Sequence, residues 1–407
     1  MSAEAWVFRR GAGGTDFTNS VISFSGNAGR RNYLDNYSGG TFQITIKNQA
    51  NESANFTRGL EVRIVFSTGV DLAWGTVIGV TYTDYPGNVG MSTATITCQD
   101  EITRAGKFTL QDFAGYSQQS TTNQAERSNE AFTGLKTPEV SRVGTGSSTA
   151  QAVTLYNGTI LNRLNLLNNT ERGALLAQSG GILFLARSEM LDYNIVNLHR
   201  TTSSTISIAY TELRRANALD NFYNQVTVSY SDASGNALAP VFANNTDSQT
   251  DNGIAGFSFE SADFSSTQAT GLASWISYTQ GDPTTLRFEV DFDDATANDT
   301  AIRDFIYNIR FFYDFASVLT WRVPGDGSDT ATNVVAEGYS FSGVPGRTSY
   351  TFYFSPAFFY NLFILDSTTS GILGGDGITY NQPEIVYDEA GWIYNDALVE
   401  NGSRLGW

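Results

Sequence analysis

Alternating apolar and polar positions dominate the chain. The segment Thr41–Lys47 alternates throughout, with Phe42, Ile44 and Ile46 on its apolar face. The same period of two recurs in Glu61–Phe66, Ser92–Cys98, Gln225–Tyr230, Leu286–Phe292 and Ser349–Phe354. Such alternation, rich in β-branched and aromatic residues, is typical of antiparallel strands with one buried face. The pattern predicts a mainly β protein, built from antiparallel β-barrel or sandwich domains.

The alternation also predicts which side chains form the core of the N-terminal part. Residues that share the apolar face of one strand must be buried together, because a shift by one residue would expose the whole set. The predicted inward positions are Phe42, Ile44, Ile46, Val62, Ile64, Phe66, Val77, Ile96 and Cys98. Cys98 is thus expected to act as a small core hydrophobe.

Helical periodicity is confined to short stretches. Apolar residues follow a 3.6-residue period over Thr154–Asn168 and near Ser266–Tyr278, and Thr170–Gln178 has a capping threonine and a closing glycine pair. About three short helices are therefore expected beside the strands.

A polar stretch separates two β-rich regions. Residues Ser117–Ala150 are rich in Ser, Thr, Gln and Asn and offer little to bury, which favours a linker or long loop. The predicted organisation is an N-terminal β-barrel domain at 1–116, the polar linker or loop at 117–150, a second β-rich domain at 151–365 and an extended C-terminal arm at 366–407.

Charge is distributed unevenly. The formal net charge is −17, and residues 282–407 alone contain 18 acidic and 6 basic side chains. Only 3 of the 24 basic residues are lysines. This balance opposes specific binding of nucleic acid, since phosphate contacts depend on clustered Lys and Arg.

The chain offers few groups for catalysis or metal binding. One cysteine and one histidine exclude an intrachain disulfide and a structural zinc site. No Gly-x-Ser-x-Gly motif is present, and Gly11–Gly14 fits neither nucleotide-binding loop. The acidic run at Asp291 has Thr296 where a calcium loop requires glycine. We therefore expect no enzyme activity, metal or cofactor, although a glycosidase-type carboxylate pair is defined only by separation in space.

Membrane insertion and secretion are not expected. No segment approaches the roughly 20 apolar residues of a membrane helix. The N-terminal residues Met1–Arg10 have neither a basic start nor an apolar run, so no signal peptide is predicted.

The C-terminal arm is unusually aromatic. Trp, Tyr and Arg are the side chains that dominate protein interfaces. The candidate subunit contacts in this segment are Tyr380, Tyr387, Trp392, Tyr394, Arg404 and Trp407. Two interpretations are open: the arm packs on its own domain, or it docks on a neighbouring subunit.

Several segments resemble the minor tail proteins of tailed bacteriophages. In the N-terminal part these are Val21–Phe24, Gly29–Asn48, Phe56–Ile64, Leu72–Val77 and Ser92–Asp100 with the following Glu101-Ile102. In the second part they are Gly180–Phe184, Asn224–Val228, Val335–Tyr339 and Tyr353–Pro356. The resemblance covers most of the chain and rests on short motifs.

The resemblance implies a structural subunit of the virion, synthesised in the host cytoplasm. It would lie at the distal end of the tail, as a hub or tip protein on β-barrel domains, and would assemble as a homo-oligomeric ring, trimeric or hexameric. Its partners would be other tail proteins, and DNA would pass through it during genome ejection without specific binding. The family implies no catalytic residue.

Two other functions stay open at this point. A receptor- or glycan-binding tail protein would show exposed aromatic platforms and bind on a glycan array. A tail-associated polysaccharide hydrolase would need paired carboxylates in a groove and would clear a zymogram.

The excess of acidic residues in the last third of the chain suggests a further hypothesis. A channel wall of like charge keeps DNA phosphates away from the surface, over about 8–10 Å at physiological salt. The candidate lumen-facing acids are Asp291, Asp293, Asp294, Asp326 and Asp329. The alternative is that these carboxylates only keep an outer surface soluble.

Overall fold

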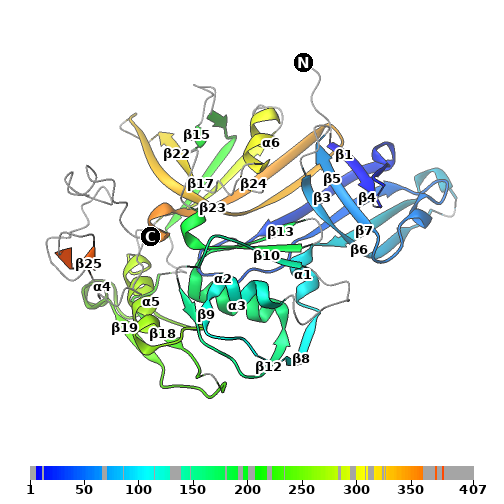
Figure 1. Cartoon of the computed structure of the whole chain (residues 1–407). Helices are drawn as coiled ribbons and strands as arrows, with labels where there is room; N and C mark the ends of the chain where they lie inside the picture. The colour runs from blue at the N-terminus through cyan, green and yellow to red at the C-terminus, as the bar shows by residue number, and fades with distance from the viewer. Residues whose placement is uncertain are drawn as a thin grey trace.

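The computed structural model describes most of the chain (Figure 1). The described residues are 6–360 and the short pairs 372–373 and 378–379. Within 6–360, the gaps are 12, 67–70, 86, 114, 129–138, 147, 179–180, 191–195, 200–206, 218–221, 233, 283–285, 294–298, 308, 310–315, 323–324 and 326. No helix in these residues is long and apolar enough to span a membrane.

One sheet of 14 strands forms the body of the molecule. Its strands are β1 (Trp6–Arg10), β2 (Thr15–Asp16), β3 (Val21–Gly29), β4 (Thr41–Lys47), β5 (Glu61–Phe66), β6 (Asp71–Thr83), β7 (Thr93–Gln99), β15 (Val196–His199), β16 (Ser207–Ala209), β17 (Glu212–Asn217), β21 (Leu286–Asp293), β22 (Ala316–Arg322), β23 (Asp329–Val344) and β24 (Arg347–Pro356). The main path is β16-β15-β22-β23-β3-β4-β7-β6-β5-β1-β2, and β24, β21 and β17 branch from β23. The mainly β, largely antiparallel fold class is confirmed.

Smaller sheets lie beside the main sheet. Strands β10 (Glu139–Val143), β14 (Gly181–Leu185) and β13 (Ala174–Gln178) form one, and β19 (Val241–Asn244), β18 (Gln225–Ser229) and β20 (Gly256–Glu260) form another. The two-stranded pairs are β8 (Thr109–Phe113) with β12 (Tyr156–Thr159), β9 (Gln119–Ser120) with β11 (Thr149–Ala150), and β25 (Ile372–Leu373) with β26 (Ile378–Thr379).

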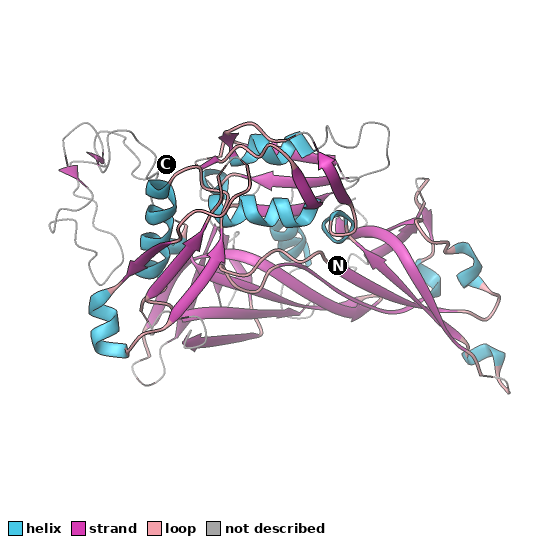
Figure 2. Cartoon of the chain, turned by 90° about the horizontal axis from the view of Figure 1, so that it is seen from below, coloured by secondary structure: helices cyan, strands magenta, loops and turns pink. Residues whose placement is uncertain are grey.

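Short helices pack beside these strands (Figure 2). The α-helices are α1 (Glu101–Ala105), α2 (Thr121–Arg127), α3 (Ile160–Glu171), α4 (Thr246–Asn252), α5 (Ser266–Thr279) and α6 (Asp299–Tyr307). The 3-10 turns are η1 (Thr18–Ser20), η2 (Glu52–Asn55), η3 (Val89–Met91), η5 (Arg187–Met190) and η8 (Ala357–Phe359). Helices α3 and α5 occupy two of the predicted helical segments.

The third predicted helix is wrong. Helix α3 ends where Arg172 adopts a left-handed conformation (φ 59°). The residues that follow, Ala174–Gln178, form strand β13 and pair antiparallel with β14. Pairing with a neighbouring apolar strand therefore overrides the local helix signals of this segment.

The predicted core of the N-terminal part is confirmed. All nine inward positions are at most 3% exposed. Phe8 of β1 contacts Phe24 of β3, with ring centroids 5.1 Å apart, although four strands separate them in the sheet. The sheet thus folds back on itself as a sandwich, and its path stays open at both ends. The barrel alternative is not realised in the described residues, because β1 packs on β3 through side chains instead of pairing with it.

The predicted linker contains ordered structure. Helix α2 and strands β9, β10 and β11 lie within residues 117–150. Thr121 and Gln124 are fully buried, and Gln124 donates hydrogen bonds to the carbonyls of Ser117, Ala150 and Gln151 at 2.8–3.2 Å. Polar composition indicates a loop only when the polar groups lack internal partners. Strand β23 also pairs with β3, so the main sheet contains strands from both predicted β-rich domains. Whether residues 1–116 and 151–365 fold independently stays a prediction.

A buried carboxylate ties α1 to the main sheet. Asp100 caps α1 by accepting a hydrogen bond from the Thr103 amide at 2.8 Å, and its second oxygen accepts from the Gly40 amide at 2.7 Å. Burial raises the pKa of Asp100 from 3.8 to about 6, against the lowering effect of these hydrogen bonds. Asp100 thus lies between the end of strand β7 and the start of helix α1.

The raised pKa predicts a pH effect on stability. Between pH 6 and 4 the folded state binds a proton at Asp100 that the unfolded state does not, so acidification stabilises the fold through this group. Relative to Asp100→Asn, we expect the wild type to gain on the order of 2–3 kcal/mol from pH 7 to 4. Urea denaturation at both pH values measures this difference. The exposed Asp16, which caps the Thr18 turn at 2.8 Å, provides the control Asp16→Asn, and equal pH dependence of wild type and Asp100→Asn contradicts the prediction.

Candidate functional site: the polar face of the main sheet

The register of the main sheet gathers hydroxyl and amide side chains on one face. Asn27 lies opposite Ser340, which lies opposite Thr351, and Gln43 lies opposite Thr97. We call this surface the polar face. Its members are Ser25, Asn27, Thr41, Gln43, Thr45, Thr81, Thr83, Thr93, Thr95, Thr97, Glu212, Arg214, Glu289, Asp291, Asp293, Ser340, Ser342, Ser349, Thr351 and Tyr353. The apolar side chains of the same strands point to the opposite face and into the core.

The centre of the polar face carries no charge. An open groove of about 490 Å³ crosses β3, β4, β23 and β24. Serine, threonine, asparagine and glutamine side chains line it: Ser25, Asn27, Thr41, Gln43, Ser340, Ser342, Ser349 and Thr351. Some of these side chains bond one another, as in Thr41 Oγ1, which donates to Asn27 Oδ1 at 3.4 Å. These groups present both donors and acceptors to solvent and no fixed charge.

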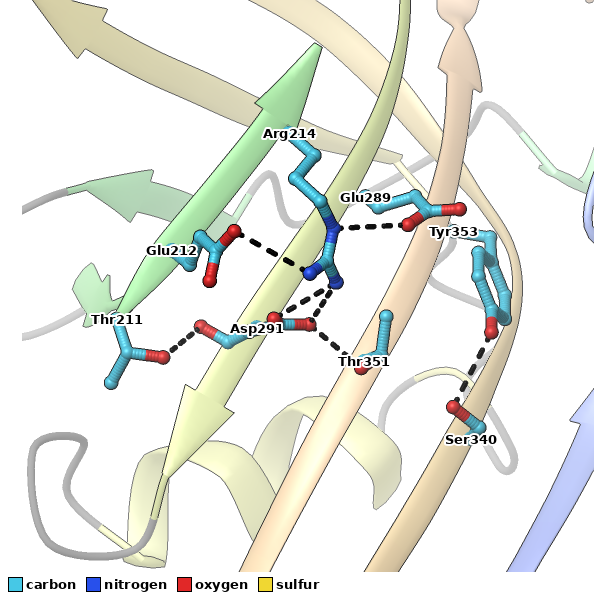
Figure 3. Close-up of polar contacts among 8 residues, drawn as sticks. All are labelled: Thr211, Glu212, Arg214, Glu289, Asp291, Ser340, Thr351 and Tyr353. Atoms are coloured by element: carbon cyan, nitrogen blue, oxygen red, sulfur yellow. Dashed lines mark hydrogen bonds and ion pairs between the residues drawn. The ribbon is translucent and has the colours of Figure 1, made fainter. Parts of the chain in front are cut away.

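Carboxylates surround one arginine at the β17–β21 end of this face (Figure 3). Arg214 donates to both oxygens of Asp291 at 2.9 Å and to Glu289 at 3.1 Å, and its contact with Glu212 is 3.4 Å. Thr351 Oγ1 donates to Asp291 at 2.7 Å. Three carboxylates and one guanidinium leave a local net charge of −2. Exposed ion pairs of this kind add little to stability, so the cluster mainly sets the charge of the surface.

The predicted acids have different positions. Asp291 and Asp293 lie on the polar face, and Asp293 pairs with Arg347 at 3.4 Å. Asp329 is exposed at the start of β23, opposite Arg322 in register. Asp294 and Asp326 lie outside the described residues. No metal-binding group of three or more His, Cys, Asp or Glu occurs in the described part of the chain.

The candidate subunit contacts of the arm cannot be placed on the fold. Tyr380, Tyr387, Trp392, Tyr394, Arg404 and Trp407 all lie outside the described residues. The described body of the chain ends at Tyr360. The role of the arm stays a prediction.

Sequence reasoning missed Arg214, which organises the acidic end of the face. Its partners Glu289 and Asp291 are 75 and 77 residues away in the chain. The available signal was the alternation in Glu212–Asn217, where Glu212 and Arg214 occupy one face of a strand. The pairing partner of that strand is not encoded locally.

Comparison with known proteins supports the fold. No family model and no curated protein matches the chain. It is similar to the solved tail protein from Neisseria meningitidis MC58, with a TM-score of 0.57 and 10% identity over 86% of this chain and 96% of that chain. It is also similar to the prophage MuSo2 43 kDa tail protein from Shewanella oneidensis, with a TM-score of 0.51 and 11% identity over 88% of this chain and 98% of that one. The chain therefore has the fold of these two tail proteins, and the resemblance seen in its sequence is confirmed at the level of the fold.

Proposed function

We propose that the chain is a structural subunit at the distal end of a phage tail, of the hub or tip kind. Copies of it assemble as a ring around the DNA channel and connect the tail tube to tip or fibre proteins. The fold shared with a solved tail protein and a solved prophage tail protein supports a tail role. In this proposal no residue of the chain acts in catalysis.

The polar face is the observation that carries the channel role. In this proposal it forms part of the channel wall, with the neutral groove and the carboxylates of the Arg214 cluster facing DNA. Arg214 and Arg347 each have carboxylate partners, which leaves these cations little capacity for phosphates. Without Lys and Arg contacts that release counterions, DNA gains no affinity for the wall and passes freely.

The acidic residues of the last third extend this proposal. Asp291 and Asp293 share the polar face, and we place Asp294, Asp326 and Asp329 toward the same lumen. Repulsion between these carboxylates and phosphates acts over about 8–10 Å at physiological salt. The competing assignment is an outer surface kept soluble by charge.

Negative-stain microscopy of the purified protein tests the assembly. We expect closed rings with a central opening, and no activity in a zymogram or on a glycan array. A protein that stays monomeric at all concentrations, alone and with tail proteins added, contradicts the proposal. Cleavage of cell-wall polysaccharide would instead support the hydrolase alternative.

The aromatic arm is expected to contribute to the ring. Deleting residues 377–407, or replacing Trp392 and Trp407 with Ala, should weaken assembly at least tenfold, because buried tryptophans commonly contribute 2 kcal/mol or more, roughly, to an interface. The monomer should keep its melting temperature. Sedimentation velocity measures the assembly, and Asn395→Ala with Asn401→Ala is the matched control. Unchanged stoichiometry and affinity after the deletion would exclude the arm as a subunit contact.

A further inference from the structure

Buried cationic and aromatic side chains converge on Tyr33, at the junction of four segments. Tyr33 is fully buried, and its ring contacts those of Tyr360 and Trp275, with centroids 4.8 and 5.8 Å away. The guanidinium carbons of Arg30 and Arg172 lie 5.4 and 5.7 Å from the Tyr33 centroid. We call these five residues the Tyr33 cluster. They come from the β3–β4 connection, the end of α3, α5 and the residue after η8.

Hydrogen-bond donors exceed acceptors in the Tyr33 cluster. The three guanidinium nitrogens of Arg172 are buried without a partner, as is Nη1 of Arg30. The hydroxyl of Tyr33 and the indole nitrogen of Trp275 are also buried without a partner. Each such group forfeits its hydration, at a cost of about 1–3 kcal/mol. Six donor atoms around one ring thus have no acceptor among the described residues, and they point to an acceptor from outside this part of the chain.

Only one of the two guanidinium groups has a hydrogen-bonded carboxylate among the described residues. Glu337 accepts from Arg30 Nε at 2.7 Å and from the Tyr360 hydroxyl at 2.6 Å. Arg172 has no such carboxylate, and its guanidinium carbon lies 4.7 Å from the ring centroid of Phe259. Burial lowers the pKa of Arg172 to about 10, so the group keeps its proton at neutral pH. Asp263 attracts this charge without a hydrogen bond to it.

We propose that the Tyr33 cluster holds a small inorganic anion of the size of chloride. Arg172 supplies the main counter-charge, and Arg30 Nη1, the Tyr33 hydroxyl and Trp275 Nε1 supply further donors. A water molecule would satisfy the donors but not the charge, whereas an anion does both. Tyr33 packs directly against Trp275, Phe359 and Tyr360, with ring centroids 4.8–5.8 Å apart, and packing this tight disfavours an anion as large as phosphate. The anion would join α3, α5, η8 and the β3–β4 connection, independently of any role in a phage tail.

Chloride-dependent thermal unfolding of the full chain tests the site. Chloride is titrated from 1 to 100 mM against sodium gluconate at constant ionic strength. For a dissociation constant near 1 mM we expect a saturable rise in melting temperature of about 3 °C. Arg172→Met should abolish this chloride dependence. Arg142→Met should retain it, because Arg142 pairs with Glu126 at the surface.

Bromide diffraction provides the second measurement, and it does not depend on the folding of a variant. Crystals grown in sodium bromide should show an anomalous peak within about 3.5 Å of the Arg172 guanidinium. A peak together with saturable chloride stabilisation supports the site. A water molecule or empty space at this position, or a wild-type melting temperature indifferent to chloride, overturns the proposal.

Discussion

Replacing Ile46 with Asp is expected to unfold the N-terminal part of the main sheet. Ile46 is fully buried in β4, between Val21 of β3 and Ala94 of β7 in register. An aspartate there has no partner in the core, so the variant loses the apolar burial of Ile46 and must also bury or neutralise a carboxyl group. The combined cost is roughly 5 kcal/mol or more, comparable with the whole stability of many domains.

Gln43→Asp is the matched control for Ile46→Asp. Gln43 is exposed on the polar face of the same strand, and the same new charge should change the free energy of unfolding by less than about 0.5 kcal/mol. Urea denaturation followed by circular dichroism measures both variants. A stable Ile46→Asp protein with a wild-type midpoint would contradict the assigned register of β4.

Glu337→Gln is expected to destabilise the fold strongly, although it is an isosteric change. The variant keeps the shape of Glu337 but leaves the fully buried Arg30 guanidinium without its counter-charge. Breaking a buried ion pair by removing one partner costs about 3–5 kcal/mol. The substitution also weakens the hydrogen bond that the Tyr360 hydroxyl donates to the residue 337 side chain. Burial raises the pKa of Tyr360, so its hydroxyl stays protonated as a donor.

The exposed pair of Glu212 with Arg214 provides the control. Its atoms are 3.4 Å apart and both side chains are about half exposed, so Glu212→Gln should cost less than about 1 kcal/mol. Chemical denaturation at pH 7 compares the two variants. Similar small losses for both would show that Glu337 does not balance the charge of Arg30.

Glu337 also shows where sequence reasoning stops. The pairing of β23 with β24 shifts between Ala336 and Gly338, so Glu337 is the extra residue of a bulge and turns inward. Alternation alone cannot locate such a residue, and its partner Arg30 lies 307 positions away. Gly29 permits the close approach here: it has φ +82°, and a Cβ would lie 2.4 Å from the Glu337 carbonyl oxygen.

The strands and the core were predictable because both follow from local patterns. Phe42, Ile44 and Ile46 alternate with polar residues, and the buried face needs no further information. The order of strands was not predictable, since β3 pairs with β23 across some 300 residues. For the same reason Asp291 could be identified as a candidate acid, but its link to Arg214 could not.

Cryo-electron microscopy of the assembled tail end tests the central claim most directly. The map must be fine enough to follow the strands β3, β23 and β24 in each copy of the chain. We predict a ring in which Ser25, Ser340 and Thr351 face the lumen, with the Arg214 cluster on the same wall. A ring in which this polar face points to the outside of the particle, or is buried between subunits, would contradict the account.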